Sequence, residues 1–237
     1  MLILLTNIFS HKNFMCGIFC TPGDNTQEFE KLYEKNSERG SQFSLSQYIK
    51  IYDKRYDIIK SNKMSDISSS MISYLNGNFK REVLLGHLRA PTSDTCRNYN
   101  PHPFIYGEWV VAHNGIINNY KDFKLDVKVD SNVIPKLLDK TCRDKDIIET
   151  LVSVFESLDG IFGCWVLNTT HKKIYLVRNA SSIFVNENCV SSAKIKGYEM
   201  LPNKSIWEYY TTELGFSLNK IADINVKNDP YFIYNEK

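Results

Sequence analysis

Short apolar strings separated by turn residues recur along this chain, and they predict buried β-strands. The string at 17–20 ends at a Thr-Pro-Gly-Asp turn, and the strings at 83–85 and 109–112 are bounded by glycines. Partial alternation over 44–53 predicts a further strand, whereas the polar stretch 60–78 is typical of loop. The pattern favours several short strands inside the protein.

Apolar residues at helical spacing predict three helices between these strands. The first is expected to start at 24–26 and to end at about 39–40, and the second spans 133–140. The clearest pattern covers 145–158, where Asp144 is a good N-cap.

The end of the chain is rich in strand patterns. The runs 161–167 and 173–177 are separated by the turn residues 168–170, which predicts a hairpin. The aromatic tail 205–237 either completes the core of the domain or docks onto a partner. Neither a repeat nor a linker divides the chain, so the pattern favours one α+β domain with packed antiparallel sheets.

The bulk composition is that of an ordinary globular protein. The chain has 237 residues, of which 43% are hydrophobic and 24% charged, and its formal net charge is +2. Neither direct nucleic-acid binding nor a membrane span is expected. The apolar start, residues 1–9, lacks the basic flank and cleavage site of a signal peptide, so a cytoplasmic protein is expected.

The cysteines show no paired metal-ligand spacing, so neither a metal nor another cofactor is expected. A disulfide framework is not expected either, because nothing indicates secretion. The six are Cys16, Cys20, Cys96, Cys142, Cys164 and Cys189.

The string Met15-Cys16-Gly17-Ile18-Phe19 looks like the start of a protein, although other residues precede it. Removal of Met15 would leave Cys16 with a thiol and a free α-amine, which together are a nucleophile and a base on one residue. The alternative is that Cys16 and Cys20 are small apolar residues of a buried strand, where free cysteine is common.

Four short motifs follow one another in the sequence. They are Met15–Phe19, Gly86–Ser93 (GHLRAPTS), Ala112–Tyr120 (AHNGIINNY) and Val129–Val133 (VDSNV). In this order they resemble the glutaminase domain of the class II glutamine amidotransferases, from Cys16 to about Val190. The resemblance implies an N-terminal-nucleophile hydrolase, which is an α+β fold: a four-layer αββα sandwich of two antiparallel sheets.

The resemblance assigns the chemistry of glutamine hydrolysis to three residues. Cys16 would attack the side-chain amide and form a glutamyl thioester, while its α-amine, with a reference pKa of about 7.7–8.0, would move the proton. The Asn114 side chain and the Gly115 backbone N–H would stabilise the oxyanion. The alternative for Asn-Gly between apolar runs is a type I′ hairpin turn.

The resemblance also assigns the recognition of free glutamine. Arg89 would bind the α-carboxylate with two parallel hydrogen bonds, Asp130 would pair with the α-ammonium, and Thr92 would lie near the carboxylate. Arg39 and Gly40 would support the nucleophile loop. The alternatives are a solvated strand-end charge for Arg89 and a helix N-cap for Asp130.

Other positions match the family less well or have no catalytic role there. His87 and His113 are interpreted as structural, because the family uses neither as a base. Gln42, Ala90 and Asn132 replace residues that some relatives carry, and these departures concern the nucleophile loop and the substrate pocket.

The ends of the chain bear on processing and on partners. Residues 1–15 are expected to be either a mis-called start or a propeptide, and residues 16–237 the glutaminase domain without a synthetase domain. The ammonia would therefore pass to a separate synthetase chain or acceptor, as in nucleotide or deazapurine modification. Two other functions remain open, another N-terminal-nucleophile amidase and a catalytically silent docking module.

Overall fold

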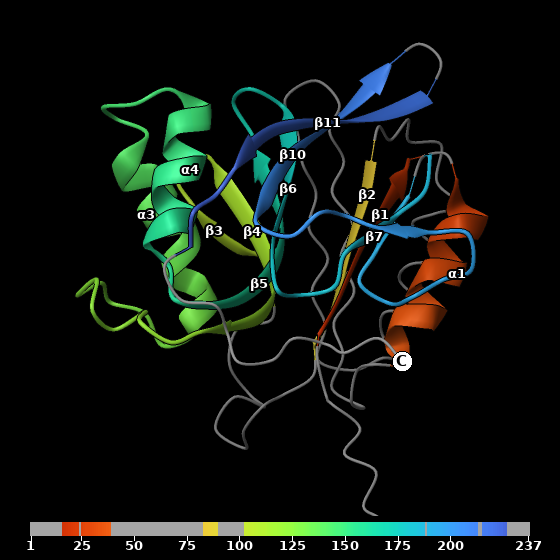
Figure 1. The fold of residues 1–237 in the computed structure, drawn as a ribbon, viewed down its shortest axis with the longest axis horizontal. Coiled ribbons are helices and arrows are strands. Elements are labelled where there is room, and N and C mark those ends of the chain that lie inside the picture. The colour runs from red at the N-terminus through yellow and green to blue at the C-terminus, as the bar shows by residue number, and fades with distance from the viewer. Residues whose placement is uncertain are drawn as a thin grey trace, which may run out of the picture.

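The protein is built from four layers, with two β-sheets packed face to face between helices (Figure 1). Helix α1 (Thr26–Ser37) covers the outer face of one sheet, and helices α3 (Val133–Thr141) and α4 (Ile147–Ser157) cover the outer face of the other. This arrangement confirms the predicted αββα sandwich. The computed structural model describes residues 16–23, 25–38, 83–89, 102–187, 189–212 and 215–226.

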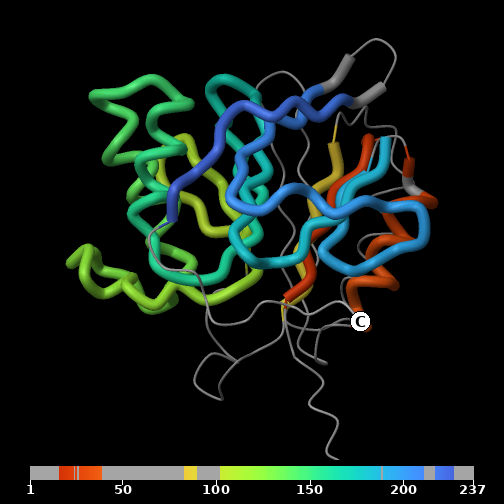
Figure 2. The backbone as a smooth tube through the Cα atoms, in the orientation of Figure 1, coloured from red at the N-terminus to blue at the C-terminus, as the bar shows by residue number. Residues whose placement is uncertain are grey.

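The first sheet has five strands in the order β2-β1-β8-β7-β9, and every neighbouring pair is antiparallel. The predicted strands β1 and β2 lie side by side at one edge, and the backbone path in Figure 2 shows the short later strands next to β1. The strands are β1 (Gly17–Pro22), β2 (Val83–Leu88), β7 (Phe184–Val185), β8 (Val190–Ser191) and β9 (Glu199–Met200).

The second sheet has six strands in the order β11-β10-β6-β5-β4-β3, again all antiparallel. The predicted hairpin is confirmed, because β5 and β6 pair directly. The strands are β3 (Phe104–Tyr106), β4 (Trp109–Ile117), β5 (Gly160–Asn168), β6 (Lys173–Asn179), β10 (Ser205–Thr212) and β11 (Gly215–Asp223).

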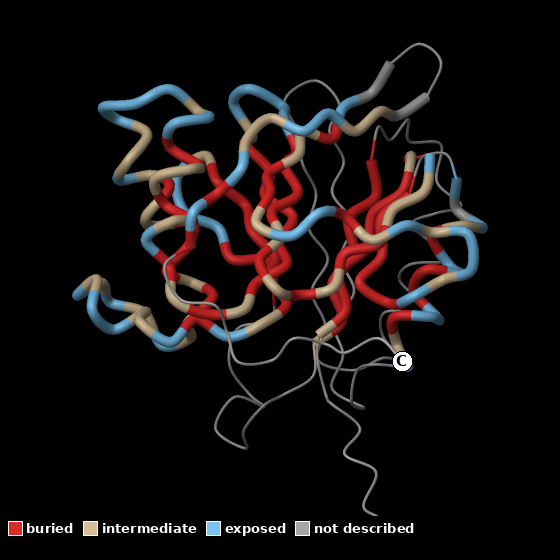
Figure 3. Tube along the Cα trace, viewed as in Figure 1, coloured by how far each residue is buried: buried red, intermediate tan, exposed pale blue. Residues whose placement is uncertain are grey.

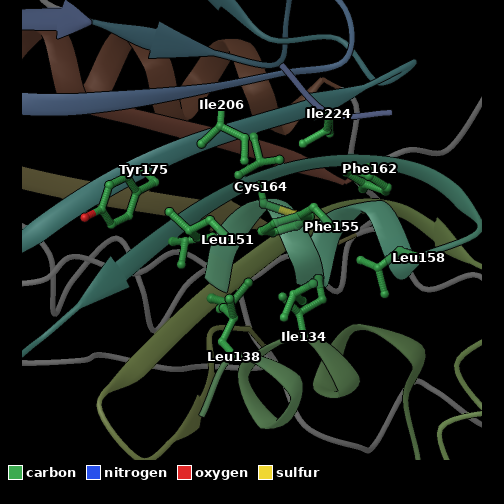
Figure 4. Close-up of a cluster of buried hydrophobic side chains, with 14 of the residues drawn as sticks. Ile134, Leu138, Leu151, Phe155, Leu158, Phe162, Cys164, Tyr175, Ile206 and Ile224 are labelled. Atoms are coloured by element: carbon green, nitrogen blue, oxygen red, sulfur yellow. The ribbon is translucent and has the colours of Figure 1, made fainter. Parts of the chain in front are cut away.

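Three groups of buried apolar side chains hold the layers together, and the strands are the most buried parts of the chain (Figure 3). One group lies between the two sheets and includes Ile18, Leu85, Ala112 and Trp165. Another joins α1 to the outer face of the first sheet. The third joins the second sheet to α3 and α4 and includes Ile134, Leu138, Leu151, Phe155, Phe162 and Ile206 (Figure 4).

Side-chain caps set the first residue of two helices, α1 and α4. Asn25 caps α1 by accepting a hydrogen bond from the N–H of Glu28 (3.1 Å), close to the predicted start. The cap of α4 is Asp146, which accepts from the N–H of Glu149 (2.9 Å), so the predicted cap at Asp144 is wrong. A start at Asp144 would place Lys145 in the first turn, where the helix dipole disfavours a cation, whereas the observed start places Glu149 there.

Strand β4 continues past the predicted end at residue 112 to Ile117, and it contains both Asn114 and Gly115. Their pairing with Gly163 and Phe162 in β5 shows that the hairpin-turn alternative is wrong. The strand was predicted to end at residue 112 because the polar residues His113 and Asn114 follow, but both of these residues are buried in the structure.

Several predictions lie outside the described residues. They concern the strand at 44–53, the loop at 60–78 and the tail beyond residue 226. The first helix is described to its end at Ser37, two residues before the predicted end at 39–40. Within the described part of the tail, Tyr209 is buried and Trp207 packs against the core between the sheets. The described segments include no helix that is long and apolar enough to cross a bilayer.

Candidate active site

Cys16 and Arg89 lie together at one end of the first sheet. They directly precede β1 and directly follow β2, which are antiparallel neighbours. Ile18, Cys20 and Leu85 point into the core between the sheets. Because side chains alternate along a strand, Cys16 and Arg89 belong to the same face. Both are partly buried, so Arg89 is not a fully solvated strand-end charge.

Two hydrogen bonds fix how the second sheet lies over the first. The Nε2–H of His87 donates to the carbonyl oxygen of His113 (3.3 Å). Trp165 pairs with Ala112 of β4, and its indole N–H donates to the carbonyl oxygen of Gly86 in β2 (3.0 Å). Strands β2 and β4 therefore advance in the same direction, and Asn114 lies near the end of the sandwich where β1 begins.

Asn114 is a buried amide without a partner. Its side chain is 0% exposed, and neither amide atom has a hydrogen-bond partner among the described residues. It belongs to the face of β4 that points between the sheets, because Val110 and Ala112 contribute to the core there. Its neighbour in β5 is Gly163, where an added Cβ would lie 3.0 Å from the Ser181 hydroxyl. An unsatisfied buried amide costs about 1–3 kcal/mol, and a catalytic role or a bound water or ion is among the explanations for such a group in a native fold.

Gly115 has a backbone conformation that a side chain would disrupt. Its φ is +145°, and an added Cβ would lie 1.9 Å from the carbonyl oxygen of Ile161 and 2.9 Å from Nε2 of His113. Glycine is therefore required both by the dihedral angle and by the close approach of β5. This conformation follows directly after the unpartnered amide of Asn114.

Asp130 is held against the end of β4 rather than at the start of α3. It lies in a short 3₁₀ turn, η2 (Asp130–Asn132), and its Oδ2 accepts the N–H of Ile117 (2.9 Å). The N-cap alternative is wrong, because α3 is preceded by Asn132, which makes no capping bond with its side chain. The carboxylate instead lies beside the strand that carries Asn114 and Gly115.

A serine links Asp130 to His113. The Ser131 hydroxyl lies 2.8 Å from Nδ1 of His113 and 3.3 Å from Oδ1 of Asp130. Nε2 of His113 donates to the carbonyl of Ile161 (3.3 Å), so in the neutral ring Nδ1 accepts the hydroxyl hydrogen. The single hydroxyl hydrogen favours the shorter contact to His113, and Oδ1 of Asp130 keeps lone pairs that can accept from a cationic ligand.

Burial keeps both histidines neutral. It lowers the pKa of His87 to about 3, an effect opposed by the hydrogen bond to His113 and reinforced by Arg89. Burial also lowers the pKa of His113, against the attraction of Asp130. Neutral rings committed to backbone bonds are consistent with the structural interpretation of these residues.

The structure thus brings Cys16, Arg89 and Asn114 to one end of the space between the sheets, with Gly115 and Asp130 nearby on β4 and η2. Thr92, Arg39 and Gly40, with the departures Gln42 and Ala90, lie outside the described residues. Ser131 was missed, since a lone serine gives no signal in one sequence. The described segments contain neither a disulfide nor a cluster of three potential metal ligands.

Comparisons with known sequences point to one enzyme group. The chain is 30% identical over 131 residues to the glutamine–fructose-6-phosphate aminotransferase of Aquifex aeolicus. It is 26% identical over 120 residues to the enzyme of the same name from Chlamydia muridarum. These matches include 51% and 46% of this chain, but the chain spans only 22% and 20% of those relatives. No protein-family model matches the chain.

Comparisons with solved structures show the fold. The glutamine phosphoribosylpyrophosphate amidotransferase of B. subtilis superposes with a TM-score of 0.64 at 15% identity, covering 89% of this chain and 50% of that one. A glutamine aminotransferase class-II domain protein from Silicibacter pomeroyi superposes with a TM-score of 0.56 at 12% identity. The match covers 87% of this chain and 99% of that protein, so the shared fold accounts for nearly all of it.

Proposed function

We propose that this chain, a class II glutamine amidotransferase domain in sequence and fold, hydrolyses the side-chain amide of glutamine and supplies the ammonia to an acceptor. The observation that carries the proposal is the fully buried, unpartnered amide of Asn114 at the end of the sandwich where β1 begins. An oxyanion is the ligand that this amide and the neighbouring backbone N–H would bind best.

The first half-reaction forms a thioester at Cys16. The thiol sulfur bonds to the amide carbon, and the α-amine of Cys16 takes the thiol proton. The negative charge that develops on the carbonyl oxygen would be bound by the Nδ2–H of Asn114 and the N–H of Gly115. When the carbon–nitrogen bond breaks, the ammonium of Cys16 returns the proton to the departing ammonia.

Two charged side chains would select free glutamine over a peptide. Arg89, on the same face as Cys16, would bind the α-carboxylate, and a guanidinium can do this with two parallel hydrogen bonds. Oδ1 of Asp130 would accept from the α-ammonium, because a carboxylate oxygen has acceptor capacity beyond its contact with Ser131. Thr92 would lie near the carboxylate, and Arg39 and Gly40 would support the nucleophile loop.

Water completes the cycle. It attacks the thioester carbon, the carbon–sulfur bond breaks, and glutamate leaves with the thiol restored. The released ammonia would pass to a synthetase or another acceptor.

The test is the release of ammonia from glutamine by the parent protein beginning at Cys16 and by its Cys16→Ala and Cys142→Ala variants. Cys142 is a suitable control, because it is also partly buried but lies after α3. Cys16→Ala is expected to abolish the reaction without unfolding the protein, whereas Cys142→Ala should retain it. An unchanged rate in Cys16→Ala would refute the proposal.

A further inference from the structure

Buried polar side chains hold the backbone that follows Cys16. The pairing of β8 with β1 stops at Phe19, because β8 ends at Ser191. Beyond that point Ser192 continues the ladder: its N–H donates to the carbonyl of Ile18 (2.8 Å), and its Oγ accepts the N–H of Ile18 (2.9 Å). A side chain thus replaces a missing strand two residues from the thiol.

Asn36 of α1 holds Ser192 in place, and both residues are 0% exposed. The Ser192 hydroxyl donates to Oδ1 of Asn36 (3.0 Å), while Nδ2 of Asn36 donates to the carbonyl of Leu32 (2.8 Å) and to Oγ of Ser191 (3.0 Å). Because the Leu32 carbonyl can only accept, the amide has one satisfactory orientation. The Ser192 hydroxyl therefore gives its hydrogen to Asn36 and keeps a lone pair for Ile18.

Asn36 also contacts the residue next to Cys16. A Cβ added to Gly17 would lie 2.8 Å from Cβ of Asn36, closer than real Cβ atoms come. Glycine at this position lets the start of β1 pack directly on α1. The same asparagine thus fixes the strand through Ser192 and through this contact.

We propose that Asn36 and Ser192 are positioning residues that aim the Cys16 thiol at the substrate carbonyl. The inference rests on the proposed function of Cys16. In the active form that function requires, Cys16 is the first residue, and chain ends fray unless they are tied down. Ordering a residue costs backbone entropy, which fixed neighbouring contacts must offset. A displacement of about 1 Å in a reacting group can reduce the rate about 100-fold.

The kinetic test compares Ser192→Ala with Ser182→Ala. Ser182 is a matched control, because its hydroxyl donates to the Ser192 carbonyl (2.8 Å), and its loss leaves the bond to Ile18 intact. For Ser192→Ala we expect kcat for glutamine to fall about 10- to 100-fold with KM changed less than about 3-fold. Ser182→Ala should retain the parent kcat. Equal kcat in the two variants would overturn the proposal.

Hydrogen exchange of the Ile18 amide in the same parent protein, beginning at Cys16, provides a readout that needs no activity. We expect protection like that of amides inside β4, and loss of this protection in Ser192→Ala. Rapid exchange in the parent would overturn the proposal even if the variant failed to fold. Asn36→Asp is a second variant, since its new oxygen would face the Leu32 carbonyl; unchanged kcat there would also count against the proposal. A parent that releases no ammonia but protects Ile18 would instead refute the proposed function.

Discussion

Replacement of Gly115 by alanine should remove the oxyanion site while leaving the fold in place. The added Cβ would lie 1.9 Å from the Ile161 carbonyl oxygen, and the φ of +145° is unfavourable for alanine. A strained backbone conformation costs about 1–3 kcal/mol, so β4 must shift away from β5 at this position. The shift would displace the N–H of Gly115 and the neighbouring amide of Asn114.

The expected kinetic effect follows from the loss of one oxyanion donor, which typically reduces kcat about 10²- to 10³-fold. The assay is steady-state ammonia release over a range of glutamine concentrations, with the melting temperature of each variant measured alongside. KM should change little, because the displaced groups act on the transition state.

Gly197→Ala is the matched control for this experiment. Its φ is also positive, at +85°, but nothing lies within 4 Å of the added Cβ. It should therefore lose about 1–2 kcal/mol of stability from the positive φ alone and retain the parent kcat. If Gly115→Ala kept kcat within about 3-fold of the parent, Gly115 would have no role in oxyanion stabilisation.

Three further predictions concern charge. Arg89→Lys should raise the KM for glutamine about 10-fold or more, because one ammonium cannot replace a two-pronged guanidinium; unchanged saturation would exclude Arg89 from recognition. Asp130→Asn should also raise KM, and an unchanged KM would exclude pairing with the α-ammonium. Acid should destabilise the fold through His87, because its pKa is 6.5 when unfolded and about 3 when folded. Between these values unfolding takes up a proton, so stability should fall about 1.4 kcal/mol per pH unit; His87→Gln should show a shallower slope in denaturant titrations.

The sequence predicted the strands and helices whose burial follows a simple period. The apolar string that begins β1 and the helical spacing over α4 gave correct element types, because long or dense apolar patterns admit few alternatives. The start of α4 was misplaced because Asp144 and Asp146 are both good caps. Which of the two caps the helix depends on the charges that each start would place in the first turn.

The layout of the first sheet could not be predicted. Strands β7, β8 and β9 have two residues each, which is too short for a period of two to be visible. Their order beside β1 is set by packing between distant parts of the chain. For the same reason the contacts of Ser192 with Ile18 and Asn36 leave no signal in the sequence.

The site residues were predicted from motifs, and the structure adds their spatial relation. Asn114 and Gly115 carried a hairpin-turn signal that only the pairing of β4 with β5 resolves. The role of Ser131 depends on hydrogen bonds across η2 and β4, which no local pattern encodes.

The central claim is that Cys16 acts as an N-terminal nucleophile. The direct measurement is ammonia release by two preparations whose first residues are established by mass spectrometry: one beginning at Cys16 and one retaining residues 1–15. General-base catalysis is typically worth 10²- to 10⁴-fold, and an amide nitrogen at Cys16 cannot supply it. The account predicts activity from the first preparation and a rate at least about 100-fold lower from the second. Equal rates from the two preparations would contradict it.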